Sequence, residues 1–164
     1  MKLETMNQLF VAELQDLYSV ETQIIKALPK MIEKTKNPQL RTAFQTHLQQ
    51  TQQQLERLNR IFDQVPDVDR DDETCEGMKG ILEEGEDIIK NAKDDDVRDA
   101  GMIAAAQKVE HYEIASYGTA RTYAQLLGRR DWAQLLEQTL QEEKDTDHKL
   151  NQLAEHVNVE ARAA

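Results

Sequence analysis

Hydrophobic residues recur at steps of three and four along most of the chain, in four long stretches and one short one. The long stretches cover residues 3–35, 38–62, 97–127 and 131–157, and the short one covers residues 74–91. Steps of three and four keep side chains on one face of an α-helix. Aromatic residues make up only 5% of the chain, and abundant Ala, Leu, Glu, Gln and Lys favour helix over sheet. The pattern therefore predicts an all-α protein with four long helices and one short helix.

Turn signals between the stretches indicate how the helices are joined. Asn37 followed by Pro38 is typical of an N-cap and a first helical position, so the second helix should begin almost without a loop. Gly128 is a C-cap signal for the third long helix, and Asp131 is expected to cap the last one. Helices joined this tightly must be antiparallel neighbours. Pro29 lies inside the first helix, where we expect a kink or a lost hydrogen bond.

An acidic connection that carries the short helix separates the two predicted hairpins. A bundle with one long crossover is the ferritin-like arrangement, whereas up-and-down bundles have only short loops. We therefore predict one domain over residues 1–164, a ferritin-like four-helix bundle with an additional short helix in the long crossover. The tail is expected to fray from about residue 158.

Acidic residues occupy the apolar faces of these helices where leucine is expected. In the third long helix, for example, the apolar face continues through two glutamates before it reaches Tyr117. The two tight turns place the polar residues of each hairpin near its middle, so that all four helices can direct them at one point. These residues are Glu21 in the first helix, His47 in the second, Glu110 and Glu113 in the third, and Glu143 and Asp147 in the last.

Carboxylates in a common core require compensating positive charge. Burying one ionised carboxylate costs several kcal/mol unless it is paired or bound to a cation. The apolar faces offer few basic residues, so we predict that the cluster binds two metal ions. Carboxylate oxygens with one imidazole suit iron or manganese, with iron preferred, whereas structural zinc sites more often use cysteine. The alternative is structural: a histidine on an apolar face is often a core residue, and buried glutamates can serve as hydrogen-bonding partners.

Charge and composition argue against several other classes of protein. The net charge of −11 argues against nucleic acid as a partner, because phosphate binding needs clustered Lys and Arg. No apolar run approaches the roughly 18 residues that cross a bilayer, and the first residues lack the pattern of an export signal. Cys75 is the only cysteine, which excludes an internal disulfide and is compatible with a reducing cytoplasm. We therefore expect a cytoplasmic protein with no membrane or nucleic-acid partner.

Several segments resemble the YciE/YciF-like family of bacterial stress proteins, which belongs to the ferritin-like superfamily. The resemblance covers nearly the whole chain and is carried by DLYSVE at residues 16–21, ALPK at 27–30, HLQQT at 47–51, AAAQKVEHYEIASYG at 104–118 and LQEEK at 140–144. The long segment through Glu110 and Glu113 is very specific. The resemblance implies a five-helix ferritin-like fold, commonly a homodimer, with a ferroxidase or related di-metal role.

One position departs from the family's pattern. The family usually has a glutamate where this chain has Gln50, whose amide oxygen can coordinate a metal but contributes no charge. The resemblance also includes Asp16, which lies about 140° around the helix from Glu21 and is expected behind the ligands. The complete set of candidate metal residues is Glu21, His47, Gln50, Glu110, Glu113, Glu143, Asp147 and Asp16.

Two functions are compatible with this set. In the first, the protein is an oxidoreductase in which ferrous ions bind between the carboxylates and react with dioxygen or peroxide. In the second, it is a stress-associated structural or interaction protein whose metal site is vestigial or stabilising. Gln50 favours the second function. Metal content and the dependence of the melting temperature on chelator distinguish the two.

Overall fold

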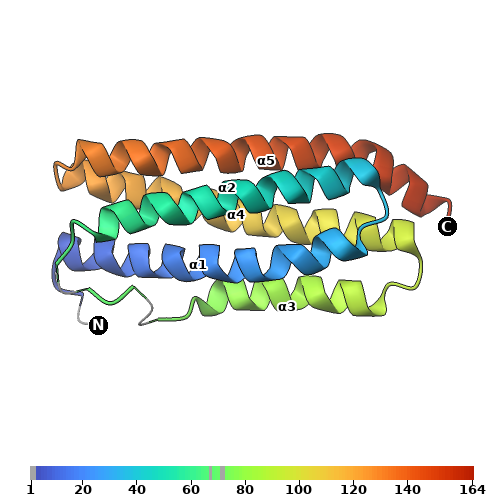
Figure 1. Ribbon diagram of the computed structural model, residues 1–164, viewed down its shortest axis with the longest axis horizontal. Coiled ribbons are helices and arrows are strands. Elements are labelled where there is room, and N and C mark those ends of the chain that lie inside the picture. Colours follow the sequence, from blue (N-terminus) through green and yellow to red (C-terminus); the bar gives the residue numbers. More distant parts are fainter. Residues whose placement is uncertain (1–2, 67, 71–72) are drawn as a thin grey trace.

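The computed structural model describes residues 3–66, 68–70 and 73–164, and all regular structure in this part of the chain is helical. Figure 1 shows the helices lying roughly along one common direction. They are α1 (Met6–Lys34), α2 (Pro38–Phe62), α3 (Glu76–Asn91), α4 (Asp95–Leu126) and α5 (Arg130–Arg162). None of the helices in the described ranges is both long and apolar enough to cross a membrane.

Four of the helices form a bundle in which every neighbour is antiparallel. α1 packs on α2 and α4, and α5 packs on the same two helices from the opposite side (Figure 1). Because α2 and α4 run in the same direction, the chain must return along the full length of the bundle between them. The connection that includes α3 makes this return, and α3 packs on the outside against α4 and α1. The predicted four-helix bundle with a short helix in the long crossover is therefore confirmed.

Most of the predicted helix ends are confirmed. The Asn37 side chain caps α2 by accepting hydrogen bonds from the backbone N–H groups of Gln39 and Leu40, at 3.0 and 3.1 Å. Gly128 follows α4 with a φ of 75°, a left-handed conformation that glycine adopts without strain. Asp94 is the N-cap of α4, and its side chain accepts hydrogen bonds from the backbone N–H groups of Asp96 and Val97.

Two details, both at the ends of α5, differ from the prediction. Asp131 is not the cap of α5, because the helix begins one residue earlier, with Arg129 at the N-cap position and no side-chain cap. Asp131 instead forms an ion pair of 2.8 Å with the Arg129 guanidinium. The guanidinium of Arg129 lies over the ring of Trp132. α5 continues to Arg162, so the tail expected to fray is helical in the structure. α1 continues through Pro29, and because proline has no backbone N–H, the helical hydrogen bond at this position is lost, as expected.

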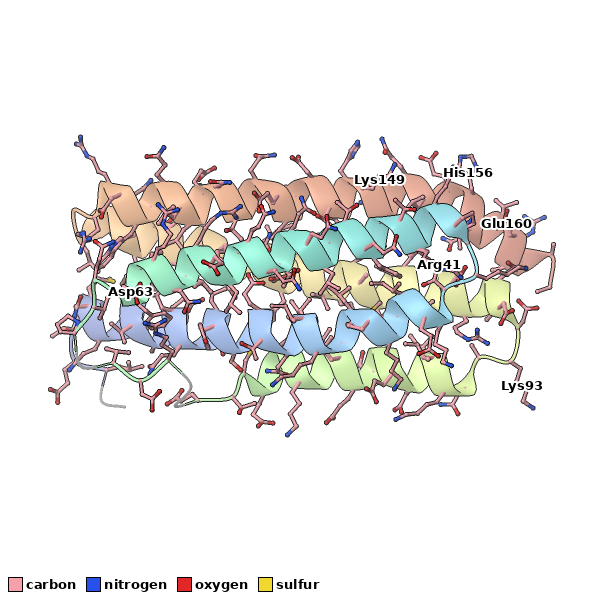
Figure 2. The ribbon with its side chains drawn as sticks, viewed as in Figure 1. Arg41, Asp63, Lys93, Lys149, His156 and Glu160 are labelled. Carbon is pink, nitrogen blue, oxygen red and sulfur yellow. The ribbon has the colours of Figure 1, made fainter. Side chains whose placement is uncertain are left out.

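The buried core has two apolar clusters with a polar layer between them. One cluster is built around Phe44 and Met102, and the other around Phe10, which stacks on Trp132 with 5.5 Å between ring centroids. On α1, Glu21 lies between residues of the two clusters, and the same holds for Glu113 on α4. Charged side chains such as Lys93, Lys149 and Glu160 project from the outside of the bundle, as Figure 2 shows. The fold thus places a layer of buried polar groups at mid-height.

Candidate metal centre

Four buried side chains from three helices converge in this layer. They are His47 of α2, Glu110 and Glu113 of α4, and Glu143 of α5, and each offers a ligand atom within 4.8 Å of the others. Donor atoms that bind one transition-metal ion at about 2.1 Å lie no more than about 4.2 Å apart. Small side-chain movements would therefore bring all four donors onto one ion, and the residues fit a metal site.

The sequence positions these side chains through simple helical spacing. Glu110 and Glu113 are three residues apart, so they share a face of α4, and both are buried as predicted. Glu143 follows Leu136 and Leu140 on the buried face of α5, also as predicted. Apolar side chains above and below each acid anchor the helices, which fixes the height of the acidic residues in the core.

The buried carboxylates of the layer lack the partners that such groups normally have. Neither oxygen of Glu113 has a hydrogen-bond partner in the described part of the chain, and one oxygen each of Glu21, Glu110 and Glu143 has none. Among the described residues, no lysine or arginine forms an ion pair with any of these four acids, and only Glu110 has an ionic partner, His47. A buried polar atom without a partner costs about 1–3 kcal/mol, and a charged one costs more. A bound cation would remove this cost.

The histidine and the acids carry strongly shifted pKa values. Burial lowers the pKa of His47 to about 4, so its ring is neutral at pH 7 and its lone pair is available to a metal. Its Nε2 lies 3.3 Å from Glu110 Oε1, without the geometry of a hydrogen bond. Burial, and then the charge of Glu143, raises the pKa of Glu110 and Glu113 well above the usual range. Burial also raises the pKa of Glu143, to about 7, although hydrogen bonds from Glu110 and Gln54 oppose the shift.

Glu21 lies in the same layer but outside the four-residue group. It is fully buried, and burial followed by the charge of Glu143 raises its pKa well above the usual range. The Tyr117 hydroxyl donates a hydrogen bond to its Oε1, while Oε2 has no partner among the described residues. Tyr117 fills the core as predicted, and it also orients this carboxylate. Glu21 therefore has one free oxygen beside the four-residue group.

Two buried residues beside the polar layer, Gln54 and Arg57, were not predicted from the sequence. Gln54 is buried and donates to Glu143, and also to Glu142 at 3.1 Å. Arg57 is buried too and forms an ion pair with Glu142 at 2.6 Å. Glu142 is thus held between α2 and α5. Gln54 and Arg57 fix the position of the α5 segment that carries Glu143.

The buried face of α2 is rotated relative to the prediction. The spacing from Leu40 and Phe44 predicts an apolar face that runs through Leu48 and Leu55, but both leucines are only half-buried. The buried positions are Leu40, Phe44, His47, Thr51, Gln54, Arg57, Leu58, Ile61 and Phe62. All of them except Arg57 and Phe62 follow one another in alternating steps of four and three, and this regularity was the signal that could have identified Gln54.

Besides Glu21, three further predicted metal residues lie outside the four-residue group. Asp147 is half-buried, and its Oδ1 lies 3.4 Å from His111 Nε2 on the α4 side. Asp16 accepts a hydrogen bond of 3.0 Å from the Tyr112 hydroxyl, which in turn lies 3.0 Å from Cys75 Sγ. The helical geometry that placed Asp16 behind the ligands agrees with this position.

Gln50, the third of these residues, lines a groove between α2 and α5. The groove leads from solvent to His47 and Glu110, and its other polar residues include Asp145 and Lys149. Gln50 thus lies on the approach to the layer, at the half-buried edge of α2. The groove gives ions in solution a polar approach to the buried donors.

Comparison with known proteins identifies the family. The family model described as "Domain of unknown function (DUF892)" matches residues 5–164. The chain belongs to the DUF892 family. Protein YciF of Escherichia coli strain K12, a relative of this chain, is 45% identical over 154 residues, which cover 94% of this chain and 93% of YciF. The resemblance to YciF-like proteins is therefore confirmed.

Solved structures of similar proteins have the same fold. The crystal structure of the E. coli stress protein YciF superposes with a TM-score of 0.90 at 44% identity, over 94% of this chain and 98% of that one. YcfI of Rhodopseudomonas palustris, whose description proposes a structural role, superposes with a TM-score of 0.87 at 40% identity, over 92% and 95% of the two chains. A Xanthomonas campestris protein at 22% identity, with a TM-score of 0.73, shares the fold.

Proposed function

We propose that the polar layer binds two transition-metal ions, iron in the first place, and that the protein oxidises ferrous iron. The observation that carries this proposal is the convergence of buried glutamates whose oxygens lack partners around a neutral histidine. Hard carboxylate oxygens and one imidazole suit iron or manganese. The DUF892 model is described as a domain of unknown function. The proposal therefore rests on the chemistry of the buried side chains.

The charges of the layer favour two ions over one. The four buried glutamates, Glu21, Glu110, Glu113 and Glu143, carry four negative charges when ionised. Two divalent cations balance these charges, whereas one would leave two negative charges in a water-poor core. His47 with Glu110, Glu113 and Glu143 would hold the first ion. The free oxygen of Glu21 would complete the second position with one of the glutamates that faces both ions.

Ferrous iron is the substrate of the proposed reaction. Two ferrous ions lose one electron each, and the oxidant accepts two electrons and two protons: peroxide becomes two water molecules, and dioxygen becomes hydrogen peroxide. The carboxylates neutralise the charge that grows on the metal, and the two apolar clusters exclude water from the layer. Metal binding also displaces the protons that the raised pKa values of these glutamates retain in the metal-free protein.

Stopped-flow measurement of ferrous iron oxidation tests the activity. Glu110→Gln should slow oxidation by roughly tenfold or more, because changes even in the groups that support a metal's ligands have effects of that size. Glu155→Gln is the matched control, since Glu155 is exposed on α5 away from the layer and should leave the rate unchanged. Equal rates for the Glu110→Gln variant and the parent would rule out the proposed activity.

A second candidate function is that of a structural or interaction protein whose metal ions only stabilise the bundle. The absence of a carboxylate at Gln50 favours it, and so does the structural role proposed for YcfI. Under this alternative, the protein binds metal and melts at a lower temperature with chelator, but does not oxidise ferrous iron faster than buffer does.

We also propose that the protein acts in the cytoplasm as a homodimer, without nucleic acid as a partner. The dimer rests on the resemblance to the YciF-like family, and the exclusion of nucleic acid rests on the net charge of −11. Light scattering coupled to size-exclusion chromatography should give twice the chain mass of 18.9 kDa. A mass of one chain at micromolar concentration would contradict the dimer.

A further inference from the structure

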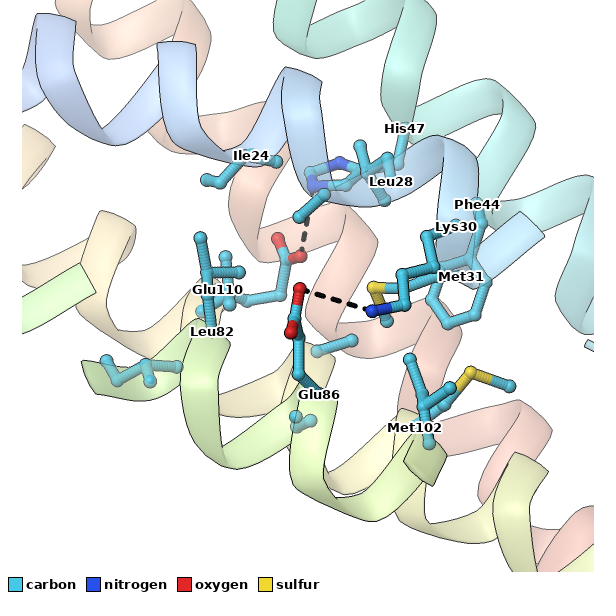
Figure 3. A pocket seen from close by; sticks show the side chains of 17 residues that line it. Ile24, Leu28, Lys30, Met31, Phe44, His47, Leu82, Glu86, Met102 and Glu110 are labelled. Atoms are coloured by element: carbon cyan, nitrogen blue, oxygen red, sulfur yellow. Dashed lines mark ion pairs between the residues drawn. The ribbon is translucent and has the colours of Figure 1, made fainter. Parts of the chain in front are cut away.

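A small apolar cavity reaches the polar layer from the side covered by α3. Figure 3 shows it between α1, α3 and α4, with Phe44 and His47 of α2 completing the lining. His47 and Glu110 approach each other along its inner side. The remaining lining is almost entirely aliphatic or aromatic and includes Ile24, Leu28, Met31, Leu82, Met102 and Val109.

The charged residues of this cavity form pairs. Lys30 Nζ lies 3.3 Å from Glu86 Oε1 in an ion pair that links α1 to α3, and both side chains are partly exposed to solvent. The second pair is formed by His47 and Glu110 in the polar layer. No other charged residue lines the cavity in the described part of the chain, so the passage between these pairs is apolar.

The polar groove reaches the same two residues from another side. His47 and Glu110 line both spaces, but the groove also presents Gln50, Asp145 and Lys149, whereas the cavity presents side chains such as Leu28. Moving a hydrated cation along an apolar surface would cost its hydration, which a polar groove partly replaces. The two approaches therefore favour different solutes: ions through the groove, and small uncharged molecules through the cavity.

The size of the cavity limits what can occupy it. Its volume is about 40 Å³. A site needs at least about 10–15 Å³ to hold one water molecule, and an engineered apolar cavity of about 150 Å³ stays dry and binds benzene. The cavity under α3 is thus too small for an aromatic ring but large enough for a molecule of two or three heavy atoms. Its lining offers water few hydrogen bonds, which favours an apolar occupant.

We infer that this cavity binds dioxygen and supplies it to the metal centre beside His47 and Glu110. The inference rests on the proposed function and selects dioxygen over peroxide, because peroxide is polar and needs hydrogen bonds that the cavity lining does not provide. Two ferrous ions then give one electron each to one dioxygen molecule, which takes up two protons and leaves as hydrogen peroxide. The peroxide, being polar, leaves through the groove.

Paramagnetic relaxation by dioxygen tests the binding step without any metal. Methyl relaxation rates of the chelated protein are compared under dioxygen and under nitrogen, with buried methyl groups of the same residue type as controls. The lining residues Ile24, Leu28 and Met102 should relax faster under dioxygen than Ile61, Leu58 and Met78, which are as deeply buried but do not line the cavity. Equal enhancement in all three pairs would overturn the inference.

Two alanine variants test whether the cavity is used. Ala27→Leu adds bulk to the cavity from α1, and Ala43→Leu adds the same bulk to the polar groove from α2; both alanines are half-buried. Ala27→Leu should remove the excess relaxation and raise the dioxygen concentration at half-maximal oxidation several-fold, without changing metal affinity. Ala43→Leu should leave both dioxygen measurements unchanged. Should Ala27→Leu destabilise the fold, Ala106→Val narrows the cavity from α4.

The results separate failure of this inference from failure of the proposed function. If the parent protein does not oxidise ferrous iron but the lining methyl groups show excess relaxation, the cavity binds dioxygen and the proposed activity is wrong. If the protein oxidises iron and Ala27→Leu leaves the dioxygen dependence unchanged, dioxygen does not reach the site through the cavity and the inference is wrong.

Discussion

Two buried acids on α4 show how differently one helix can use a carboxylate. Asp99 is buried near the start of the helix, and its oxygens accept hydrogen bonds from the backbone N–H groups of Lys36 and Asn37, at 3.1 and 2.6 Å. Glu113 is buried at mid-height, and neither of its oxygens has a partner in the described part of the chain. Burial alone therefore does not identify a functional acid.

The hydrogen-bond partners of a buried acid therefore distinguish a structural role from a role in binding. Asp99 ties α4 to the turn between α1 and α2, where the backbone N–H groups at the start of a helix lack helical partners. It therefore contributes to stability in any state of the protein. Without a bound cation, the burial of Glu113 only lowers the stability of the fold. Its presence in the core is therefore explained by metal binding and not by folding. The following predictions test this distinction.

Replacing Asp99 should have the largest effect on the metal-free protein. Asp99→Ala leaves two backbone N–H groups of the α1–α2 turn without acceptors, which should lower the free energy of unfolding by about 2–4 kcal/mol. The loss should be the same with and without metal. Urea denaturation under both conditions measures it, and a loss that appears only with metal would contradict a purely structural role for Asp99.

Replacing Glu113 should have the opposite sign in the metal-free protein. Glu113→Gln keeps the shape and removes a charge whose ionised form is unfavourable in the core, so at pH 8 the chelated variant should be more stable than the chelated parent, by about 1 kcal/mol or more. With metal, the parent should be the more stable of the two. A variant that is less stable than the parent in chelator would show that Glu113 has a structural role.

The pH dependence of the metal-free protein follows from the same raised pKa values. Glu143 has a pKa of about 7 in the folded chain against an ordinary value of 4.5, so between these values the folded state holds more protons than the unfolded state. Its contribution to stability is fully present below pH 4.5 and is lost as the pH rises to about 7. Glu21, Glu110 and Glu113 shift in the same direction.

His47 acts in the opposite sense. Its pKa falls from 6.5 to about 4 on folding, so its contribution to stability is lost as the pH falls through that window. Since four carboxyls oppose one imidazole, the chelated protein should melt at a higher temperature at pH 6 than at pH 8. Scanning calorimetry measures the difference, and Glu113→Gln should reduce it. A chelated protein that melts higher at pH 8 would contradict the raised pKa values.

Restoring the family's usual residue at position 50 should have the smallest effect. Gln50→Glu adds a carboxylate to the half-buried edge of the groove, outside the four-residue group. Ferrous iron should bind more tightly by a few-fold only, because a partly exposed charge is screened by solvent. Competition with a coloured chelator measures the affinity. An increase of several orders of magnitude would show that the residue at position 50 coordinates the metal directly.

The sequence predicted the part of the site that strict helical spacing determines. Glu110 and Glu113 continue an apolar face of α4 at steps of three and four, so both could be placed in the core. On α2, Leu48 and Leu55 suggested a face that the tertiary packing rejects in favour of His47 and Gln54. Local periodicity cannot decide between two adjacent faces of one helix when both carry leucines.

Contacts between distant segments could not be predicted from spacing. The bonds that Asp99 makes with the α1–α2 turn join residues more than sixty positions apart, and the cavity under α3 depends on how that helix lies on α4. Arg57 and Glu142 are another example, because each is unremarkable in its own helix and their pairing arises only when α2 meets α5. Such features depend on the heights and rotations of whole helices.

The metal content of protein purified without chelator, measured together with its melting temperature, shows whether the polar layer binds two metal ions. We predict close to two iron or manganese ions per chain, and a melting temperature that falls by about 8–16 °C in excess chelator, the shift expected for loss of about 4 kcal/mol of binding energy. Protein that contains almost no transition metal, takes up none on incubation with ferrous iron and melts at the same temperature with chelator would contradict the account.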